Sequence, residues 1–226
     1  MNIRLAQLNP TIGDIDGNVS LILEAMEKAE SDGIDLLVLP ELVVCGYPPM
    51  DLIERPAFRK AIYEANNQIT AASGDTAVLF GTATPNNGMG RHCFNSALFV
   101  HNGATQAEVH KTLLPTYDVY DELRYFEPGT QAFDCVEFQG RKLGITICED
   151  IWHNFELSYL SYDINPTKEL VASGAEAILN VSGSPFSRGK PNGRQRMLQQ
   201  HAKRWEVPIF YANQVGGNTE LVSDGD

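Results

Sequence analysis

A cysteine at the end of an expected strand is the side chain in this sequence best placed to act as a nucleophile. Leu143, Ile145 and Ile147 alternate with other residues and predict a short strand that runs directly into Cys148. The two carboxylates that follow are typical of the first turn of a helix. A thiol held where a strand becomes a helix can attack a carbonyl carbon while backbone N–H groups lie nearby, which is the chemistry of acyl transfer. Because most free cysteines are small apolar core residues, this hypothesis needs partners elsewhere in the chain.

Two charged residues also follow expected strands directly. Glu41 comes after Pro40, which ends the run 34–39, apolar except for Asp35, a pattern typical of a strand buried on both faces. Lys111 follows the strand expected at 104–110. Reactive groups of α/β proteins collect at strand ends because the sheet fixes them there. Alone, each residue could be an ordinary surface charge, but together they predict that Glu41, Lys111 and Cys148 meet at one site.

The secondary-structure elements expected around these residues alternate between strands, with a period of two residues, and helices, with a period of about 3.6 residues. Strands are expected at 2–8, 34–39, 76–84, 93–101, 104–110, 133–138, 143–148, 177–181 and 208–213, and helices at 19–29, 58–72, 166–173 and 193–205. Strands alternating with helices indicate the α/β class, and Asn102-Gly103 predicts an antiparallel hairpin. Residues 111–130 show no periodicity, and so long a connection in a compact domain usually has a function. No element is assigned to residues 152–165.

The composition excludes several classes of function. The 226 residues fit one large domain, and a hydrophobic share of 43% provides an ample core. The net charge of −12, from 17 basic and 29 acidic residues, repels phosphate backbones, so no nucleic-acid partner is expected. No apolar run approaches the roughly 18 residues of a membrane span, and the N-terminus has no signal-like pattern. We therefore expect a cytoplasmic protein without a membrane partner.

The four cysteines do not form a metal-binding or disulfide pattern. They stand at Cys45, Cys93, Cys135 and Cys148, without any paired short spacing. Zinc sites and disulfide frameworks both depend on such spacing. Neither a metal site nor a disulfide is expected.

The strand-end motifs, taken together, resemble those of the nitrilase (carbon–nitrogen hydrolase) superfamily, in the order found there. They are residues 39–42 (LPEL), 110–115 (HKTLLP) and 147–150 (ICED). Four further segments resemble the N-terminal glutaminase domain of glutamine-dependent NAD⁺ synthetases: residues 46–52 (GYPPMDL), 115–122 (PTYDVYDE), 124–126 (RYF) and 182–186 (SGSPF). The similarity covers essentially the whole chain, and the combination is far more specific than any one motif.

The resemblance implies a fold and a domain organisation. The fold would be a four-layer α-β-β-α sandwich, with residues 1–226 forming one glutaminase domain. The last strands of such a sandwich would follow Asp226, and an ATP-dependent synthetase domain would lie beyond them. The chain is therefore expected to be a truncated piece of a longer enzyme, or a free-standing amidase shortened at its end. ATP and Mg would act only at the absent synthetase domain, a partner in cis, and no cofactor is expected for the glutaminase step. Assembly into a homo-oligomer is also implied.

The resemblance also implies a role for each catalytic residue. Cys148 would attack the side-chain amide of glutamine and form a thioester. Glu41 would take the thiol proton, pass it to the departing ammonia and then activate water. Lys111, with the backbone N–H of Glu149, would stabilise the oxyanion, and Glu122 would hold the lysine in place. Carboxylates around Cys148 raise the pKa of a thiol, and Lys111 is the cation that offsets them.

The resemblance also implies that three residues, Tyr117, Ser184 and Lys190, occupy glutamine-binding positions, and Trp152 is a further candidate for the same pocket. Tyr117 and Ser184 could hydrogen-bond the polar end of glutamine, Lys190 could pair with its α-carboxylate, and Trp152 could form a pocket wall. Arg188 is a weaker candidate for the same pocket. Each has an ordinary alternative: a packed loop aromatic, a helix cap or a solvated surface charge.

Three other functions stay open on the sequence. A Cys-His hydrolase would use His153 or His110 as the base, although His153 would lie further along the helix after Cys148 and turn away from it. A nitrilase-type amidase could act on another small amide. A non-catalytic subunit could use the sandwich only for assembly, but intact Glu41, Lys111 and Cys148 argue against it.

Overall fold

Two β-sheets form the centre of the molecule, for which a computed structural model describes residues 1–153 and 162–225. The first sheet has the order β1-β2-β3-β4-β5, and the second has the order β6-β7-β8-β9. The strands of the first sheet are β1 (Ile3–Leu5), β2 (Leu36–Val38), β3 (Ala77–Pro85), β4 (Cys93–His101) and β5 (Ala104–His110). Those of the second are β6 (Val136–Phe138), β7 (Arg141–Ile147), β8 (Ala177–Ser182) and β9 (Ile209–Asn213).

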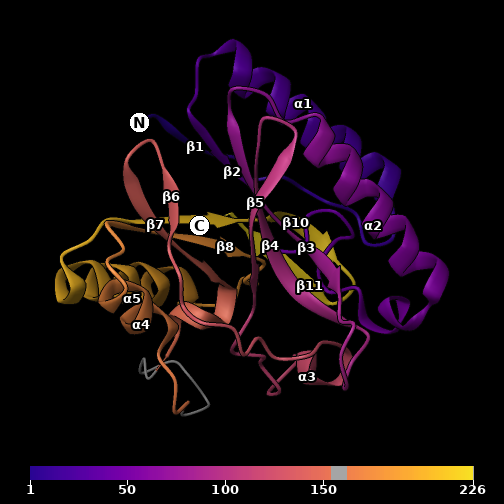
Figure 1. The fold of residues 1–226 in the computed structure, drawn as a ribbon. Helices are drawn as coiled ribbons and strands as arrows, with labels where there is room; N and C mark the ends of the chain where they lie inside the picture. Colours follow the sequence, from indigo (N-terminus) through magenta and orange to yellow (C-terminus); the bar gives the residue numbers. More distant parts are fainter. Residues whose placement is uncertain (154–161, 226) are drawn as a thin grey trace.

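Helices cover the outer face of each sheet (Figure 1). The pair α1 (Ile15–Ser31) and α2 (Pro56–Ala71) lies on the first sheet, and α4 (Pro166–Ala172) and α5 (Lys190–Trp205) lie on the second. Three short turns complete the helical part: η1 (Met50–Glu54), α3 (Glu122–Tyr125) and η2 (Cys148–Ile151). The result is the expected α-β-β-α sandwich.

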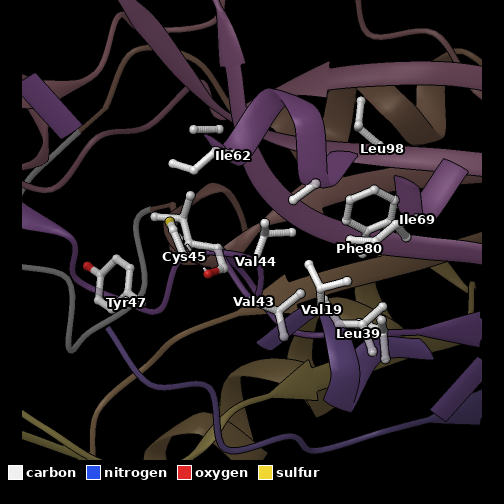
Figure 2. Packing of buried hydrophobic residues seen from close by; sticks show 14 of the residues in the cluster. Val19, Leu39, Val43, Val44, Cys45, Tyr47, Ile62, Ile69, Phe80 and Leu98 are labelled. Atoms are coloured by element: carbon white, nitrogen blue, oxygen red, sulfur yellow. Dashed lines mark hydrogen bonds between the residues drawn. The ribbon is translucent and has the colours of Figure 1, made fainter. Parts of the chain in front are cut away.

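Alternating side chains of β2 explain why residues 36–39 are buried on both faces, whereas Ile34 and Asp35 before them are only partly buried. Leu36 and Val38 belong to the core between the two sheets, whereas Leu37 and Leu39 belong to the core beneath α1 and α2. Figure 2 shows the second of these cores, in which Val19 of α1 and Ile69 of α2 pack near Leu39. The strand therefore has no polar face and lies in the interior.

Strand direction brings the ends of separate strands to one edge of the sandwich. In the first sheet β2 and β3 are parallel, and β4 runs against both β3 and β5. The residues that follow β2 and β5 therefore leave the sheet at the same end, where β4 begins. In the second sheet β7 and β8 are parallel, so the residues that follow them also leave together.

The expected hairpin is present, since Asn102 and Gly103 both adopt positive φ, 52° and 74°, between β4 and β5. A second hairpin, β10 (Val215–Asn218) with β11 (Leu221–Asp224), was not predicted, because glycines interrupt its alternation. Of residues 152–165, which were left unassigned, 154–161 lie outside the described residues. Within the described part of the chain, no helix combines the length and apolarity that crossing a membrane requires.

Candidate active site

A cavity of about 500 Å³ opens where the strands of both sheets end. Cys148 borders it, together with Tyr117 from the irregular segment 111–130 and Trp152 just after η2. Ser184, shortly after β8, and Lys190, the first residue of α5, line the other part. Residues that follow strands of both sheets thus face one space.

Cys148 directly follows β7 in a strained backbone conformation. Its φ is 43°, in the left-handed region that non-glycine residues rarely occupy, and its side chain is only 7% exposed. The continuation is a single 3₁₀ turn that ends at Ile151, so the longer helix expected from Glu149 and Asp150 does not form. The strand-to-turn bend places the sulfur at the sheet edge.

Glu41 is completely buried and held from both sheets. Its Oε1 accepts a hydrogen bond from Asn95 Nδ2 at 2.7 Å, and its Oε2 accepts one from the Gly183 N–H at 2.9 Å. Gly81 of β3 allows this approach, because a Cβ there would lie 2.4 Å from the Glu41 Cα. The carboxylate therefore has a fixed orientation at the contact between the sheets.

Lys111 is also fully buried and lies between two carboxylates. Its Nζ is 2.7 Å from Glu41 Oε1 and 2.8 Å from both oxygens of Glu122. Burial opposes the charge of the ammonium, but Glu122 and Glu41 outweigh it and raise the pKa of Lys111 well above its ordinary value. A permanent cation therefore lies beside Glu41.

The charges of Glu41, Lys111 and Glu122 also act on the pKa of Cys148. Burial, followed by the charge of Glu41, raises its pKa to about 12, while Lys111 and a hydrogen bond with Ser182 lower it. Burial likewise raises the pKa of Glu122, and Lys111 opposes that shift. At neutral pH the sulfur is therefore a thiol, and its proton must leave during the reaction.

A third carboxylate faces the cavity from the position after the cysteine. Glu149 is 4% exposed and accepts hydrogen bonds from the hydroxyls of Tyr117, at 3.0 and 3.1 Å, and Tyr162, at 3.0 Å. Burial raises the pKa of Glu149, and Lys111 and both tyrosines act against it. The structure thus brings Tyr117 to the pocket as predicted, with its hydroxyl bonded to Glu149.

The remaining binding residues predicted from the sequence line the same cavity. Lys190 Nζ is 3.3 Å from the Tyr120 hydroxyl and 5.7 Å from the centre of the Trp152 ring. Burial lowers the pKa of Lys190. Ser184 is buried, with its Oγ 3.4 Å from Arg194 Nη2. Arg188 also lines the cavity but is exposed. All these residues therefore border the cavity that contains Cys148.

Three residues of the network were not identified from the sequence. Asn95 donates to both Glu41 and Glu122, the latter at 3.3 Å, and the Tyr47 hydroxyl donates to Glu122 at 2.7 Å. Tyr162 lies within residues 152–165, to which no element was assigned. The adjacent polar residues Asn95 and Ser96 in the apolar strand β4 were a signal that could have identified Asn95.

Two histidines considered as alternative bases have other partners. His110 stacks on Phe94 and lies 2.9 Å from Glu108, and His153 Nε2 is 2.7 Å from the Tyr162 carbonyl oxygen. His153 lies beyond the end of η2 rather than further along a helix. Among the described residues, no group of three or more histidine, cysteine or acidic side chains is arranged to hold a metal ion.

Comparison with known proteins shows the family and the fold of the chain. The family model for carbon-nitrogen hydrolases matches residues 2–225. The glutamine-dependent NAD(+) synthetase of Synechocystis sp. is 41% identical over 99% of this chain, which spans only 41% of that protein. The solved structure of the Acinetobacter baumannii synthetase with ADP has a TM-score of 0.88 at 36% identity, over 99% of this chain and 40% of that one. An amidase from Nesterenkonia sp., at 24% identity and a TM-score of 0.79 over 100% of this chain and 80% of its own, shares the fold.

Proposed function

The chain belongs to the carbon–nitrogen hydrolase family, and from that premise we propose that it hydrolyses the side-chain amide of glutamine through a thioester on Cys148. The observation that carries the proposal is the buried contact between Lys111 and Glu41, whose charges both act on the pKa of Cys148. Cys148 borders a cavity that a small amino acid can enter. Thiol, carboxylate and cation are the three groups that amide cleavage by a cysteine requires.

Glu41 acts first as the base. Because the Cys148 sulfur holds its proton at neutral pH, the S–C bond forms as that proton moves to Glu41. The hydrogen bonds from Asn95 and Gly183 fix the carboxylate for this transfer. A buried carboxylate is a better acceptor when its orientation is set before the substrate arrives.

Lys111 acts on the oxygen of the amide. As the carbonyl carbon becomes tetrahedral, its oxygen gains negative charge, which the ammonium and the backbone N–H of Glu149 stabilise. Glu122 holds the lysine through both of its oxygens, as the resemblance implied. The rise in the pKa of Lys111 keeps the ammonium charged throughout the cycle.

The intermediate then collapses in two steps. Glu41 returns its proton to the amide nitrogen, the C–N bond breaks, and ammonia leaves while a γ-glutamyl thioester stays on Cys148. Glu41 next removes a proton from water, which attacks the thioester carbon and releases glutamate and the thiol. The net change consumes one water and one amide, and every step uses side chains of this chain.

The cavity supports glutamine as the substrate. Lys190 offers a cation for the α-carboxylate, next to the aromatic rings of Tyr120 and Trp152. Tyr117 and Ser184 add polar groups at the same space. A pocket with a cation on one side and the Glu149 carboxylate on another fits a zwitterionic amino acid better than a simple amide.

The wider role is part of the same proposal. The synthetases that this chain resembles are much longer, and we propose that the ammonia serves ATP-dependent amidation of deamido-NAD⁺ to NAD⁺ by a synthetase domain in cis. ATP and Mg would act at that domain. Homo-oligomeric assembly and a cytosolic location belong to the proposal as well, and the four free cysteines, Cys45, Cys93, Cys135 and Cys148, support a reducing compartment.

The test is covalent trapping of the nucleophile. We expect 6-diazo-5-oxonorleucine, an electrophilic glutamine mimic, to give one adduct, located by mass spectrometry on Cys148 and absent in Cys148→Ala. The half-buried Cys135 serves as an internal control that stays unmodified. Glutamate release is then compared between glutamine and simple aliphatic amides. A labelled protein that prefers the simple amides would replace the glutaminase assignment with an amidase, and no adduct at all would reject both.

A further inference from the structure

We infer that Asp150 is a positioning residue, which fixes the segment that carries Lys111 to the strand end that carries Cys148. The inference rests on the roles proposed above for those two residues. Asp150 lies within the η2 turn, two positions after the nucleophile, and its carboxylate is 2% exposed. Its carboxylate accepts hydrogen bonds from three backbone N–H groups and does not line the cavity.

The carboxylate joins two distant parts of the chain. Its Oδ1 accepts hydrogen bonds from the N–H groups of Thr112, at 3.1 Å, and Leu113, at 2.8 Å, directly after Lys111. Its Oδ2 accepts one from the N–H of Ile147, at 3.0 Å, directly before Cys148. A single buried side chain therefore holds the residues on either side of the proposed oxyanion contact.

This link matters because, among the described residues, no strand of one sheet pairs with a strand of the other. Apolar side chains such as Val38, Leu79 and Leu179 fill the space between them, and such packing is not directional. Hydrogen bonds can set the register where packing alone does not. One such bond, from the Gly183 N–H to Glu41, orients the base across the sheets. The Asp150 carboxylate does the same for Lys111 and Cys148.

An ionised aspartate suits this position for geometric reasons. Its two oxygens can accept three N–H groups, whereas an asparagine must turn its NH₂ group toward at least one of these donors. Glutamate keeps both acceptor oxygens but extends the carboxylate by one methylene. Asp150→Asn and Asp150→Glu therefore disturb the same link in different ways.

Substitution of Asp150 should shift Lys111 relative to Cys148, and this shift should affect one reaction of Cys148 more than another. Thioester formation from glutamine needs Lys111 near the developing oxyanion, and a misplacement of about 1 Å can cost about 100-fold in rate. Alkylation of Cys148 by iodoacetamide displaces iodide and forms no oxyanion. The substitution should therefore slow glutamine turnover far more than alkylation, a difference that simple loss of folded protein does not produce.

The experiment uses the full chain, with Thr146→Val as the matched control. Thr146 lies on the same strand as Ile147 and accepts a buried hydrogen bond from Asn180 at 2.9 Å, away from the proposed chemistry. We expect Asp150→Asn to lower kcat for glutamine by about 10- to 100-fold, with KM and the alkylation rate changed by less than about threefold. Thr146→Val should lower the melting temperature while kcat per folded molecule stays unchanged.

Three results would overturn the inference. One is an unchanged kcat in Asp150→Asn; another is an equal loss of turnover and alkylation, as for a merely destabilised protein. If Asp150→Asn does not fold, Asp150→Glu and amide hydrogen exchange in the wild-type chain replace it. Fast exchange at Thr112, Leu113 and Ile147 is the third result, since it would show that the link is absent. Wild-type protein without glutaminase activity would reject the proposed function, while the exchange data would still report on the link.

Discussion

The protonation state of Cys148 gives the sharpest test of the proposed chemistry. Burial and the charge of Glu41 raise the pKa of the thiol from 9.0 to about 12, which corresponds to about 4 kcal/mol against ionisation. At pH 8 the thiolate fraction is then about 10⁻⁴. We expect the ultraviolet absorbance of a thiolate, taken as the difference between wild type and Cys148→Ser, to show no step up to about pH 10.

The unfolded chain provides the control for this titration. In concentrated urea the same difference should show a step near pH 8.5, the ordinary value for cysteine. Glu41→Gln removes the second largest cause of the shift, so the folded variant should ionise at lower pH than wild type and yet hydrolyse glutamine more slowly. A thiolate step below about pH 8 in the folded wild type would refute a mechanism in which Glu41 removes the proton during attack.

Three further predictions follow from individual contacts. Lys111→Met should lower the free energy of unfolding by about 3–5 kcal/mol in chemical denaturation, because it leaves Glu41 and Glu122 buried without their cation. Lys190→Met should raise KM for glutamine by about 10-fold or more, with kcat changed by less than about threefold in steady-state assays, because it removes the cation proposed for the α-carboxylate. For Asp150, burial raises the pKa from 3.8 to about 7 against three backbone N–H groups that lower it, so the carboxylate is ionised in the folded protein above about pH 7 and the protein loses stability as pH rises from 3.8 through 7. Relative to Asp150→Asn, the wild type should therefore lose about 4 kcal/mol of stability across that window, as measured by urea unfolding at a series of pH values.

Each of these predictions has a result that contradicts it. Lys111→Met as stable as wild type would show that the two carboxylates take up protons at little cost instead of remaining charged. Lys190→Met with an unchanged KM would place the α-carboxylate elsewhere in the cavity. A pH-independent stability difference for Asp150→Asn would mean that Asp150 titrates alike in the folded and unfolded chains.

Local pattern was enough to predict most of the fold. The expected strands 93–101 and 104–110 coincide with β4 and β5, because their alternating residues and the Asn102-Gly103 turn act over short distances. Helix α1 begins at Ile15, earlier than its first apolar residue suggested, since Asp14 caps it. The β10–β11 hairpin was missed because glycines interrupt its alternation, and the short η2 turn was missed because distant contacts determine it. Asp150, for example, bonds the segment after Lys111 instead of starting a helix.

The residue order alone predicts that Glu41, Lys111 and Cys148 each follow a strand, and motif likeness suggested their roles. The folded structure adds that Lys111 lies 2.7 Å from Glu41 and that Asn95 donates to the same carboxylate. It also adds that burial keeps the thiol protonated. These contacts could not be read from the sequence because strand order and sheet packing set distances between residues far apart in the chain, whereas periodicity reports only the neighbours of each residue.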